Sequence, residues 1–164
     1  GKGIDQLQNC IDLIKTDPTS RRILMSGWNP CQLKEMCLPP CHVSYQWYVE
    51  DDKLSCMMYQ RSGDLFLGVP FNIASTAFLT LMMATLTNKK LGKIIITLGD
   101  SHIYHNHFEA VKEQLSRDIR KMPEVRVKLE EKNIENMNIE DFTYDDFLIQ
   151  NYKPHGKISA PMSV

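Results

Sequence analysis

The sequence predicts a single mixed α/β domain of the α+β type, with a mainly mixed or antiparallel sheet and helices packed against it. Residues 42–49 and 53–60 are rich in β-forming side chains and flank an acidic turn, which is typical of an antiparallel hairpin. Residues 72–87 are apolar on nearly every side, which is typical of a helix buried in a core. The 164 residues suit one domain, residues 1–164, with a sizeable core.

Shorter patterns predict the remaining elements. Ile4, Leu7, Ile11 and Ile14 recur at helical spacing and indicate a first helix that ends at 16–18. The others are, in chain order, a strand at 22–28, a short helical turn at 33–36, a buried strand at 93–98, a charged amphipathic helix at 108–119, a strand at 124–129, a solvated loop at 130–140 and an alternating segment at 142–149.

Charge and cysteine content exclude several classes of protein. The 19 basic and 20 acidic residues give a net charge of −1, so no global basic field gathers nucleic acid and any anion site must be local. We find no signal-peptide pattern and no apolar run of transmembrane length, and expect no membrane association. The five cysteines are odd in number and lack scaffold-like spacing, which indicates reduced thiols and a cytoplasmic protein.

Three polar clusters among turn-forming residues point to chemistry. Cys41 lies in Leu-Pro-Pro-Cys-His (38–42), Arg61 in Gln-Arg-Ser-Gly-Asp (60–64), and Asn72 in the segment 67–75. Cys41 begins the first hairpin strand and Arg61 follows the second, so antiparallel geometry brings them to the same edge of the sheet. A guanidinium favours a thiolate and can hold a phosphate. Each cluster alone fits a plainer explanation, a structural thiol, a surface pair or a helix cap, but together they predict a nucleophile for an anionic substrate.

The chain resembles the thymidylate synthase family. The matching segments occur in the family's order and cover nearly the whole chain: 17–22 (DPTSRR), 26–30 (SGWNP), 38–42, 60–64, 67–75, 99–107 (GDSHIYHNH) and 158–164 (ISAPMSV). The resemblance implies a three-layer fold with its sheet at a dimer interface. It also implies a methyltransferase that converts dUMP to dTMP, with methylenetetrahydrofolate as donor of the one-carbon unit and hydride and with Cys41 adding to the pyrimidine.

The resemblance implies three groups of site residues. The catalytic group is Cys41, Arg61 and Asn72. The dUMP-binding group is Arg21, Arg22, Arg61, Ser62, Asp64, Asn72, His102 and Tyr104, with Arg21 and Arg22 donated across the interface of a homodimer. The folate-binding group is Asp64, Gly68, Ser163 and Val164, the last two in a closing tail, while Gln60 and Ser75 belong to the pocket wall.

A metal site is not expected. The cysteines at 31, 37 and 41 have C-x5-C and C-x3-C spacing, which does not match paired zinc ligands. His102, His105 and His107 lack a carboxylate or cysteine pattern to complete a set of ligands. The resemblance likewise implies no metal.

Asn72 is the predicted specificity residue. An amide offers a donor and an acceptor together, and uracil presents the complementary pair at N3–H and O4. The family's relatives that hydroxymethylate dCMP carry an acid at this position, so Asn72 favours uracil. The predicted helix start at Asn72 would add positive partial charge beside the base.

Members of the family are considerably longer at the N-terminus. The resemblance therefore implies that this chain corresponds to the C-terminal part of the enzyme. It places a catalytic glutamate, a further arginine and part of the folate pocket in an N-terminal segment. It leaves open whether a reductase domain is also fused upstream. Three interpretations stay open: a thymidylate synthase polypeptide, a dCMP hydroxymethylase of the same fold, and a non-catalytic remnant that binds nucleotide or, weakly, RNA.

Overall fold

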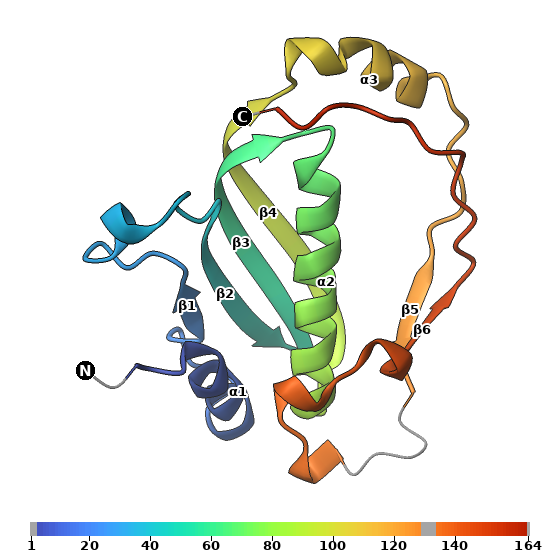
Figure 1. The fold of residues 1–164 in the computed structure, drawn as a ribbon. Helices are drawn as coiled ribbons and strands as arrows, with labels where there is room; N and C mark the ends of the chain where they lie inside the picture. The colour runs from blue at the N-terminus through green and yellow to red at the C-terminus, as the bar shows by residue number, and fades with distance from the viewer. Residues whose placement is uncertain (1–2, 129–133, 164) are drawn as a thin grey trace.

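The computed structural model describes residues 3–128 and 134–163. Its main body is a four-stranded sheet in the order β1-β2-β3-β4 (Figure 1). β1 (Leu24–Ser26), β2 (His42–Glu50) and β3 (Lys53–Asp64) are antiparallel neighbours, and β4 (Lys90–His102) runs parallel to β3. The sheet is therefore mixed, and the predicted hairpin of β2 and β3 is confirmed.

The hairpin turn explains why these two strands pair in one register. Asp51 and Asp52 have φ of 48° and 61°, a left-handed conformation that a short polar side chain tolerates better than most. The turn sets Trp47 opposite Cys56 and Tyr45 opposite Met58. A bulge between His42 and Ser44 then shifts the register at the start of β2, next to Cys41.

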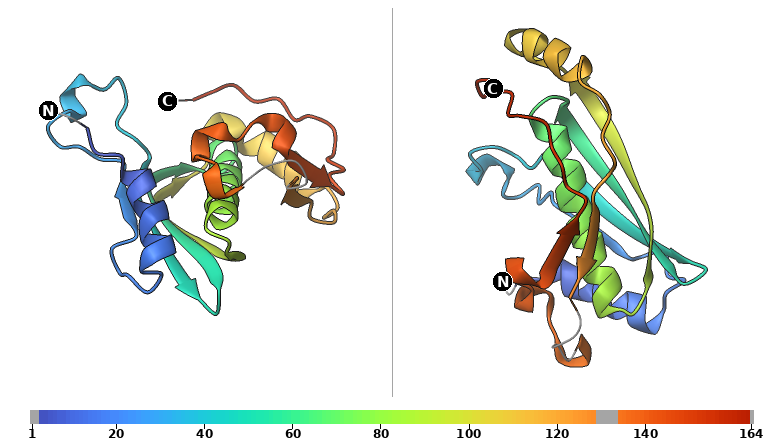
Figure 2. Two further views of the ribbon diagram at one scale, coloured as in Figure 1. Left: turned by 90° about the horizontal axis from the view of Figure 1, so that it is seen from below. Right: turned by 90° about the vertical axis from the view of Figure 1, so that its right-hand side faces the viewer.

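Helix α2 (Gly68–Leu86) connects β3 to β4 and lies along one face of the sheet (Figures 1 and 2). It begins four residues before the predicted start, because Pro70 is accepted in a first helical turn, where its missing N–H has no partner to lose. Asn72 thus lies one turn inside the helix, and the prediction that Asn72 starts it is wrong. Thr76 and Thr80 are buried, and each hydroxyl donates to the backbone carbonyl four residues earlier.

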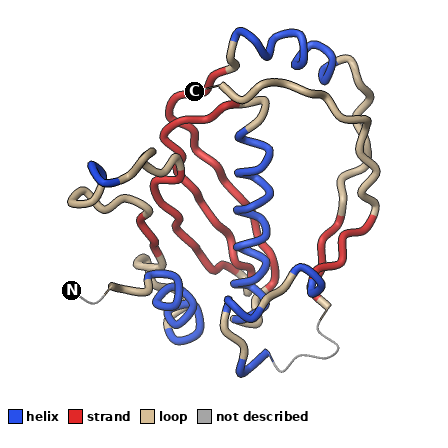
Figure 3. The backbone as a smooth tube through the Cα atoms, in the orientation of Figure 1, coloured by secondary structure: helices blue, strands red, loops and turns tan. Residues whose placement is uncertain are grey.

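Helix α2 is also the one helix of the described residues that is long and apolar enough to cross a membrane, by length and composition alone. The expectation that no apolar run reaches this length is therefore wrong. The apolar character of α2 has a structural explanation, because the helix is the middle of three layers (Figures 2 and 3). The sheet packs on one side, and β5 (Glu124–Val127) and β6 (Phe147–Gln150) pack on the other, where the rings of Phe78 and Phe147 lie 5.1 Å apart.

The core lies between the sheet and the two helices α1 (Gln6–Thr16) and α2. Asp5 caps α1 by accepting a hydrogen bond from the Gln8 backbone N–H. Apolar side chains from α1, the sheet and α2 meet in one cluster: Cys10, Ile11, Ile14, Ile23, Trp47, Leu54, Cys56, Met83, Ala84 and Leu86.

The opposite face of the sheet is exposed in this chain. Tyr48, Met57 and Tyr59 are 53%, 44% and 38% exposed, and Ile95 on β4 is 50% exposed. The prediction of a buried strand at 93–98 is wrong for this reason: within the described residues, β4 is an edge strand, with β3 as its neighbour and no helix on its outer face.

The remaining elements differ from prediction mainly at their ends. Helix α3 (Phe108–Leu115) ends before residue 119, and β1 is shorter than 22–28 because the chain turns at residues 21–22. The alternating segment 142–149 becomes a strand only at Phe147, since residues 144–146 form a capped 3₁₀ turn. Residues 129–133, which include the end of the predicted strand 124–129 and part of the predicted loop 130–140, lie outside the described residues. Further 3₁₀ turns occur at Leu33–Glu35, His105–His107, Ile134–Asn136 and Ile139–Asp141.

Candidate functional site

Strand pairing brings the sequence motifs to one edge of the sheet. The Arg61 backbone N–H donates to the Cys41 carbonyl at 2.9 Å, which joins the thiol segment to the end of β3. Along the parallel pair, Ser62 lies opposite Asp100 and Asp64 lies opposite His102. The site residues expected from 38–42, 60–64 and 99–104 therefore meet where β3 and β4 end.

Arg61 holds the segment that carries Cys41. Its guanidinium donates from Nε to the Pro40 carbonyl at 3.1 Å and from Nη2 to the Pro39 carbonyl at 2.7 Å. The Trp28 indole N–H also donates to Pro40, at 3.0 Å. Two of the five guanidinium N–H groups are used in this way, so three remain for an anion. The predicted proximity of the guanidinium to the Cys41 segment is confirmed.

The five thiols have different environments. Burial raises the pKa of Cys56 to about 11 and also raises the pKa of Cys10, and both side chains are 1% exposed. These two thiols are therefore protonated and inert at neutral pH. Cys31 and Cys37 are exposed, and Cys41 is half-buried at the edge that Arg61 shares.

Gln60 fixes the amide of Asn72. Its side chain is 2% exposed, and its Nε2 donates to the Ser62 carbonyl at 2.7 Å and to Asn72 Oδ1 at 3.0 Å. With Oδ1 turned to Gln60, the Nδ2 donors of Asn72 are left for another partner. Ser75, predicted for the pocket wall, lies on the exposed side of α2 and donates to the Asn72 carbonyl at 3.1 Å.

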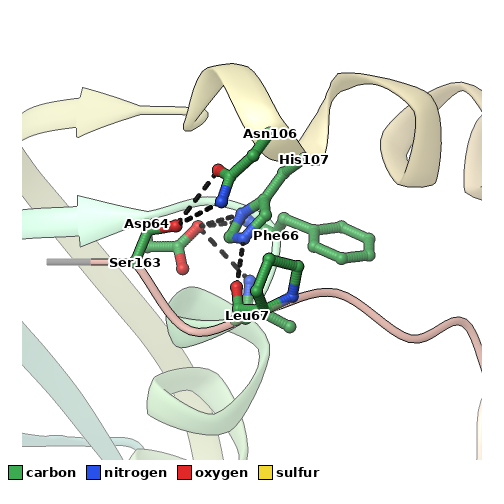
Figure 4. Close-up of polar contacts among 7 residues, drawn as sticks. Asp64, Phe66, Leu67, Asn106, His107 and Ser163 are labelled. Carbon is green, nitrogen blue, oxygen red and sulfur yellow. Dashed lines mark hydrogen bonds and ion pairs between the residues drawn. The ribbon is translucent and has the colours of Figure 1, made fainter.

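Asp64 lies between the turn at Phe66 and Leu67 and the C-terminal segment, residues 157–163 (Figure 4). Its Oδ1 accepts from the backbone N–H groups of Phe66 at 3.0 Å and Leu67 at 3.3 Å, which fixes the carboxylate before α2 begins. The same oxygen lies 3.9 Å from His107 Nδ1, and the side chain of His107 is fully buried. Asp64 thus keeps Oδ2 available.

His107 and Asn106 anchor the C-terminal segment (Figure 4). His107 Nε2 donates to the Pro161 carbonyl at 2.7 Å. The Asn106 amide and the Ser163 hydroxyl exchange hydrogen bonds at 2.8 and 3.0 Å. Sequence reasoning considered His107 only as a possible metal ligand and gave Asn106 no role. Their place in the motif 99–107, which already held His102 and Tyr104, was the available signal.

His102 and Tyr104 lie together as predicted. Their rings meet edge to face with centroids 4.9 Å apart. His102 Nδ1 donates to the Asp100 carboxylate at 2.8 Å, which leaves Nε2 free to meet a ligand. Asp100 was not among the predicted residues, although it lies two residues from His102 and shares its face of β4.

Arg21 and Arg22 do not join this edge within the chain. They form an exposed turn that lines a hollow of about 240 Å³ with Asp17, Thr19 and Ser20. Leu24, two residues after Arg22, pairs with Gln46 on β2, and Gln46 pairs with Met57 on β3. Met57 precedes Arg61 by four residues. At ~3.3 Å per residue, this sets the pair more than ~13 Å from Arg61 along the sheet.

A pocket of mixed apolar and polar lining lies beside the turn that follows Asp64. Phe66, Leu67 and Phe71 line this pocket of about 620 Å³ together with Tyr152 and Ile158, which follow β6, and polar side chains that include Arg117 and Asp118. Phe71 is 76% exposed, and the nearest atoms to an added Cβ on Gly68 are 3.5 and 3.8 Å away. Among the described residues, no group of three His, Cys, Asp or Glu side chains could hold a metal ion. Val164 lies outside the described residues.

A family model described as thymidylate synthase matches residues 1–164, the whole chain. The chain belongs to the thymidylate synthase family. The resemblance seen in the sequence is confirmed, and the mixed sheet with its helices is consistent with the family's α+β fold. Membership supports an enzyme of nucleotide biosynthesis, a transferase with a general role in dUMP methylation. The family uses methylenetetrahydrofolate as co-substrate.

The thiol environments predict a labelling pattern for the native chain. At pH 8, a limiting alkylating reagent should modify Cys31, Cys37 and Cys41 but neither Cys10 nor Cys56. Burial and a pKa of about 11 keep Cys56 protonated, so its rate should stay low until the pH approaches that value. Peptide mass spectrometry measures each site, with the urea-unfolded chain as control. Labelling of native Cys56 as fast as that of Cys37 would contradict the assignment.

Proposed function

We propose that this chain, as part of a thymidylate synthase, serves the conversion of dUMP to dTMP with methylenetetrahydrofolate as the one-carbon and hydride donor, through a covalent bond between Cys41 and the pyrimidine. The observation that carries the proposal is the junction of Arg61 with residues 39–41, at the edge that also holds Asp64, Asn72 and His102. A nucleophile, a phosphate ligand and a base-reading amide converge there.

Cys41 acts as the nucleophile. Its thiolate adds to C6 of uracil, and the electron pair of the C5–C6 double bond moves through C5 and C4 onto O4, so C5 becomes nucleophilic. Donors positioned before the reaction stabilise the charge on O4. After the C5 proton has left and C5 carries the methyl group, loss of the thiolate from C6 restores the double bond. Methylenetetrahydrofolate, when bound, supplies the carbon and the hydride.

Asn72 reads the base. Nδ2 donates to uracil O4, and the second lone pair of Oδ1 accepts from N3–H. Gln60 supports this role because its Nε2 holds Oδ1 of Asn72, which leaves the Nδ2 donors for O4. Cytosine presents an acceptor at N3 and a donor at C4, so the same amide orientation meets it with two mismatched contacts.

The phosphate and the sugar occupy the flanks of the base. Three free N–H groups of Arg61 and the hydroxyl of Ser62 hold the phosphate by charge-assisted hydrogen bonds. Tyr104 and His102, whose ring is oriented by Asp100, bind the 3′-hydroxyl of the sugar.

The folate binds beside the nucleotide. Oδ2 of Asp64 can accept from the pterin ring, because the backbone N–H groups of Phe66 and Leu67 occupy Oδ1. Gly68 leaves space for a close approach, and the pocket lined by Phe66, Leu67 and Phe71 offers the apolar wall that a flat ring needs. Ser163 and Val164, the latter outside the described residues, are the remaining proposed folate-binding residues, and their role is to exclude water from the bound folate.

A second copy of the chain completes the phosphate site. The exposed face of the sheet carries Tyr48, Met57, Tyr59 and Ile95, an apolar surface of the kind that marks an interface. Arg21 and Arg22 lie too far from Arg61 to share a phosphate within one protomer. In a two-fold dimer built on this face, Arg21 and Arg22 of the partner subunit supply the further positive charge.

Replacement of Cys41 by alanine should abolish turnover and leave nucleotide binding in place, because the phosphate ligands are on other residues. The measurement is release of tritium from C5 of labelled dUMP, with dUMP affinity measured separately. Cys37→Ala, at an exposed thiol four residues earlier, is the matched control and should stay active. Tritium release by Cys41→Ala above a trace level would show that another group is the nucleophile.

Asn72→Asp should shift the preference from dUMP toward dCMP. An ionised carboxylate cannot donate to O4, whereas a protonated one can donate to cytosine N3 and accept from its amino group. The discrimination should change by at least about tenfold, below the limit of ~10⁴ for a matched polar pair. The quantity to measure is kcat/KM for both nucleotides, with exposed Asn9→Asp as control. An unchanged ratio would mean that Asn72 does not read the base and would reopen the hydroxymethylase interpretation.

Mixed dimers should restore activity between two inactive variants. Arg21→Ala and Cys41→Ala each disable both sites of their own dimer, but one site of the heterodimer combines an intact thiol with an intact arginine pair. The two variants are mixed under mild denaturation, and heterodimers are confirmed by native mass spectrometry. Heterodimers without recovered dTMP formation would refute donation across the interface.

A further inference from the structure

His107 is a buried side chain that the proposed chemistry does not use. It closes the 3₁₀ turn His105–His107 and is fully buried between Phe66 and Tyr104, whose rings lie 5.4 and 5.5 Å from its own. The Pro161 carbonyl can only accept, so Nε2 carries a proton. Nδ1 lies 3.9 Å from Asp64 Oδ1, beyond hydrogen-bond distance (Figure 4).

Packing alone does not explain a histidine at this position. Nδ1 is buried and has no hydrogen-bond partner among the described residues. A buried polar atom in that condition is costly, and an apolar side chain would fill the same space without the cost. The polar contact that the ring does make, to Pro161, is the feature that distinguishes His107 from a filler.

The C-terminal segment depends on few contacts beside the site. It passes the start of α2 and ends near the ends of β3 and β4 (Figure 1). Among the described residues, segment 157–163 forms its hydrogen bonds through His107 with Pro161 and through Asn106 with Ser163. The Asn106 pair is exposed to water, whereas the His107 imidazole is buried, so the His107 bond is the stronger anchor.

We propose that His107 is a positioning residue that holds the C-terminal segment, residues 157–163, beside Asp64 through its hydrogen bond to the Pro161 carbonyl. The ring donates to Pro161 from a single position, since Phe66 and Tyr104 restrict its rotation. This inference rests on the proposed function, in which the C-terminal segment meets the folate.

The first test separates the two ring nitrogens. In His107→Gln, the side-chain amide N can reach the position of Nε2 and still donate to Pro161, whereas in His107→Asn it reaches only the position of Nδ1. His107→Asn should raise KM for methylenetetrahydrofolate by about tenfold, the effect of one hydrogen bond to a closing segment. The Kd for dUMP should not change, and His107→Gln should restore most of the loss. His105→Asn, at an exposed histidine of the same turn, is the control.

The second test observes the segment directly by amide hydrogen exchange. In His107→Asn, peptides that cover residues 157–164 should exchange faster than in the wild type, while peptides from β2, β3 and α2 should not change. A double-mutant cycle with a chain that lacks residues 161–164 should show no further effect of His107→Asn on KM for the folate. Unchanged exchange of the segment, a uniform increase across the chain, or additive effects in the cycle would overturn the proposal.

A third measurement needs no substitution at residue 107. In the chain that carries ¹⁵N-labelled histidine, removal of residues 161–164 should shift the Nε2–H resonance of His107 and leave that of His155 in place. An unmoved His107 resonance would overturn the proposal even if the His107 variants do not fold. If the enzyme that contains this chain forms no dTMP, the proposed function fails, whereas the exchange and resonance measurements still decide whether His107 holds the segment.

Discussion

The hydrogen bonds between Arg61 and residues 39–41 are the interaction on which the site depends. Through these bonds, Arg61 near the end of β3 holds residues 39–41, which precede β2. The backbone N–H of Arg61 and two of its five guanidinium N–H groups are used for this support, which leaves three N–H groups for another partner. Arg61 therefore links the position of the proposed nucleophile to the position of the proposed phosphate, and neither can shift alone.

A second principle of this site is that buried polar side chains position the groups proposed to touch the ligands. Gln60 orients Asn72, and His107 lies between Asp64 and the C-terminal segment. Both are almost fully buried, so their hydrogen bonds are formed away from water and hold their partners more firmly than surface contacts would. The residues proposed to bind ligands are more exposed, as binding requires.

The layered arrangement explains how the chain combines a packed core with exposed apolar surfaces. Helix α2 is covered by the sheet on one side and by β5 and β6 on the other, which accounts for its lack of a polar stripe. The outer face of the sheet and the start of α2 keep large apolar groups exposed, among them Tyr59, Ile95 and Phe71. These are the places where the proposed second copy and the proposed folate would be accommodated.

The sequence by itself determined the mixed fold class, the β2–β3 hairpin and the approach of Arg61 to the Cys41 segment, because alternation and turn residues act locally and antiparallel pairing then fixes which ends meet. Only the tertiary structure decided that β4 lies at an edge and that Gln60 and His107 position their neighbours. The physical reason is that these features depend on contacts between residues far apart in the chain. Pro161 lies 54 residues from His107, and no local pattern records that their backbone and side chain would meet.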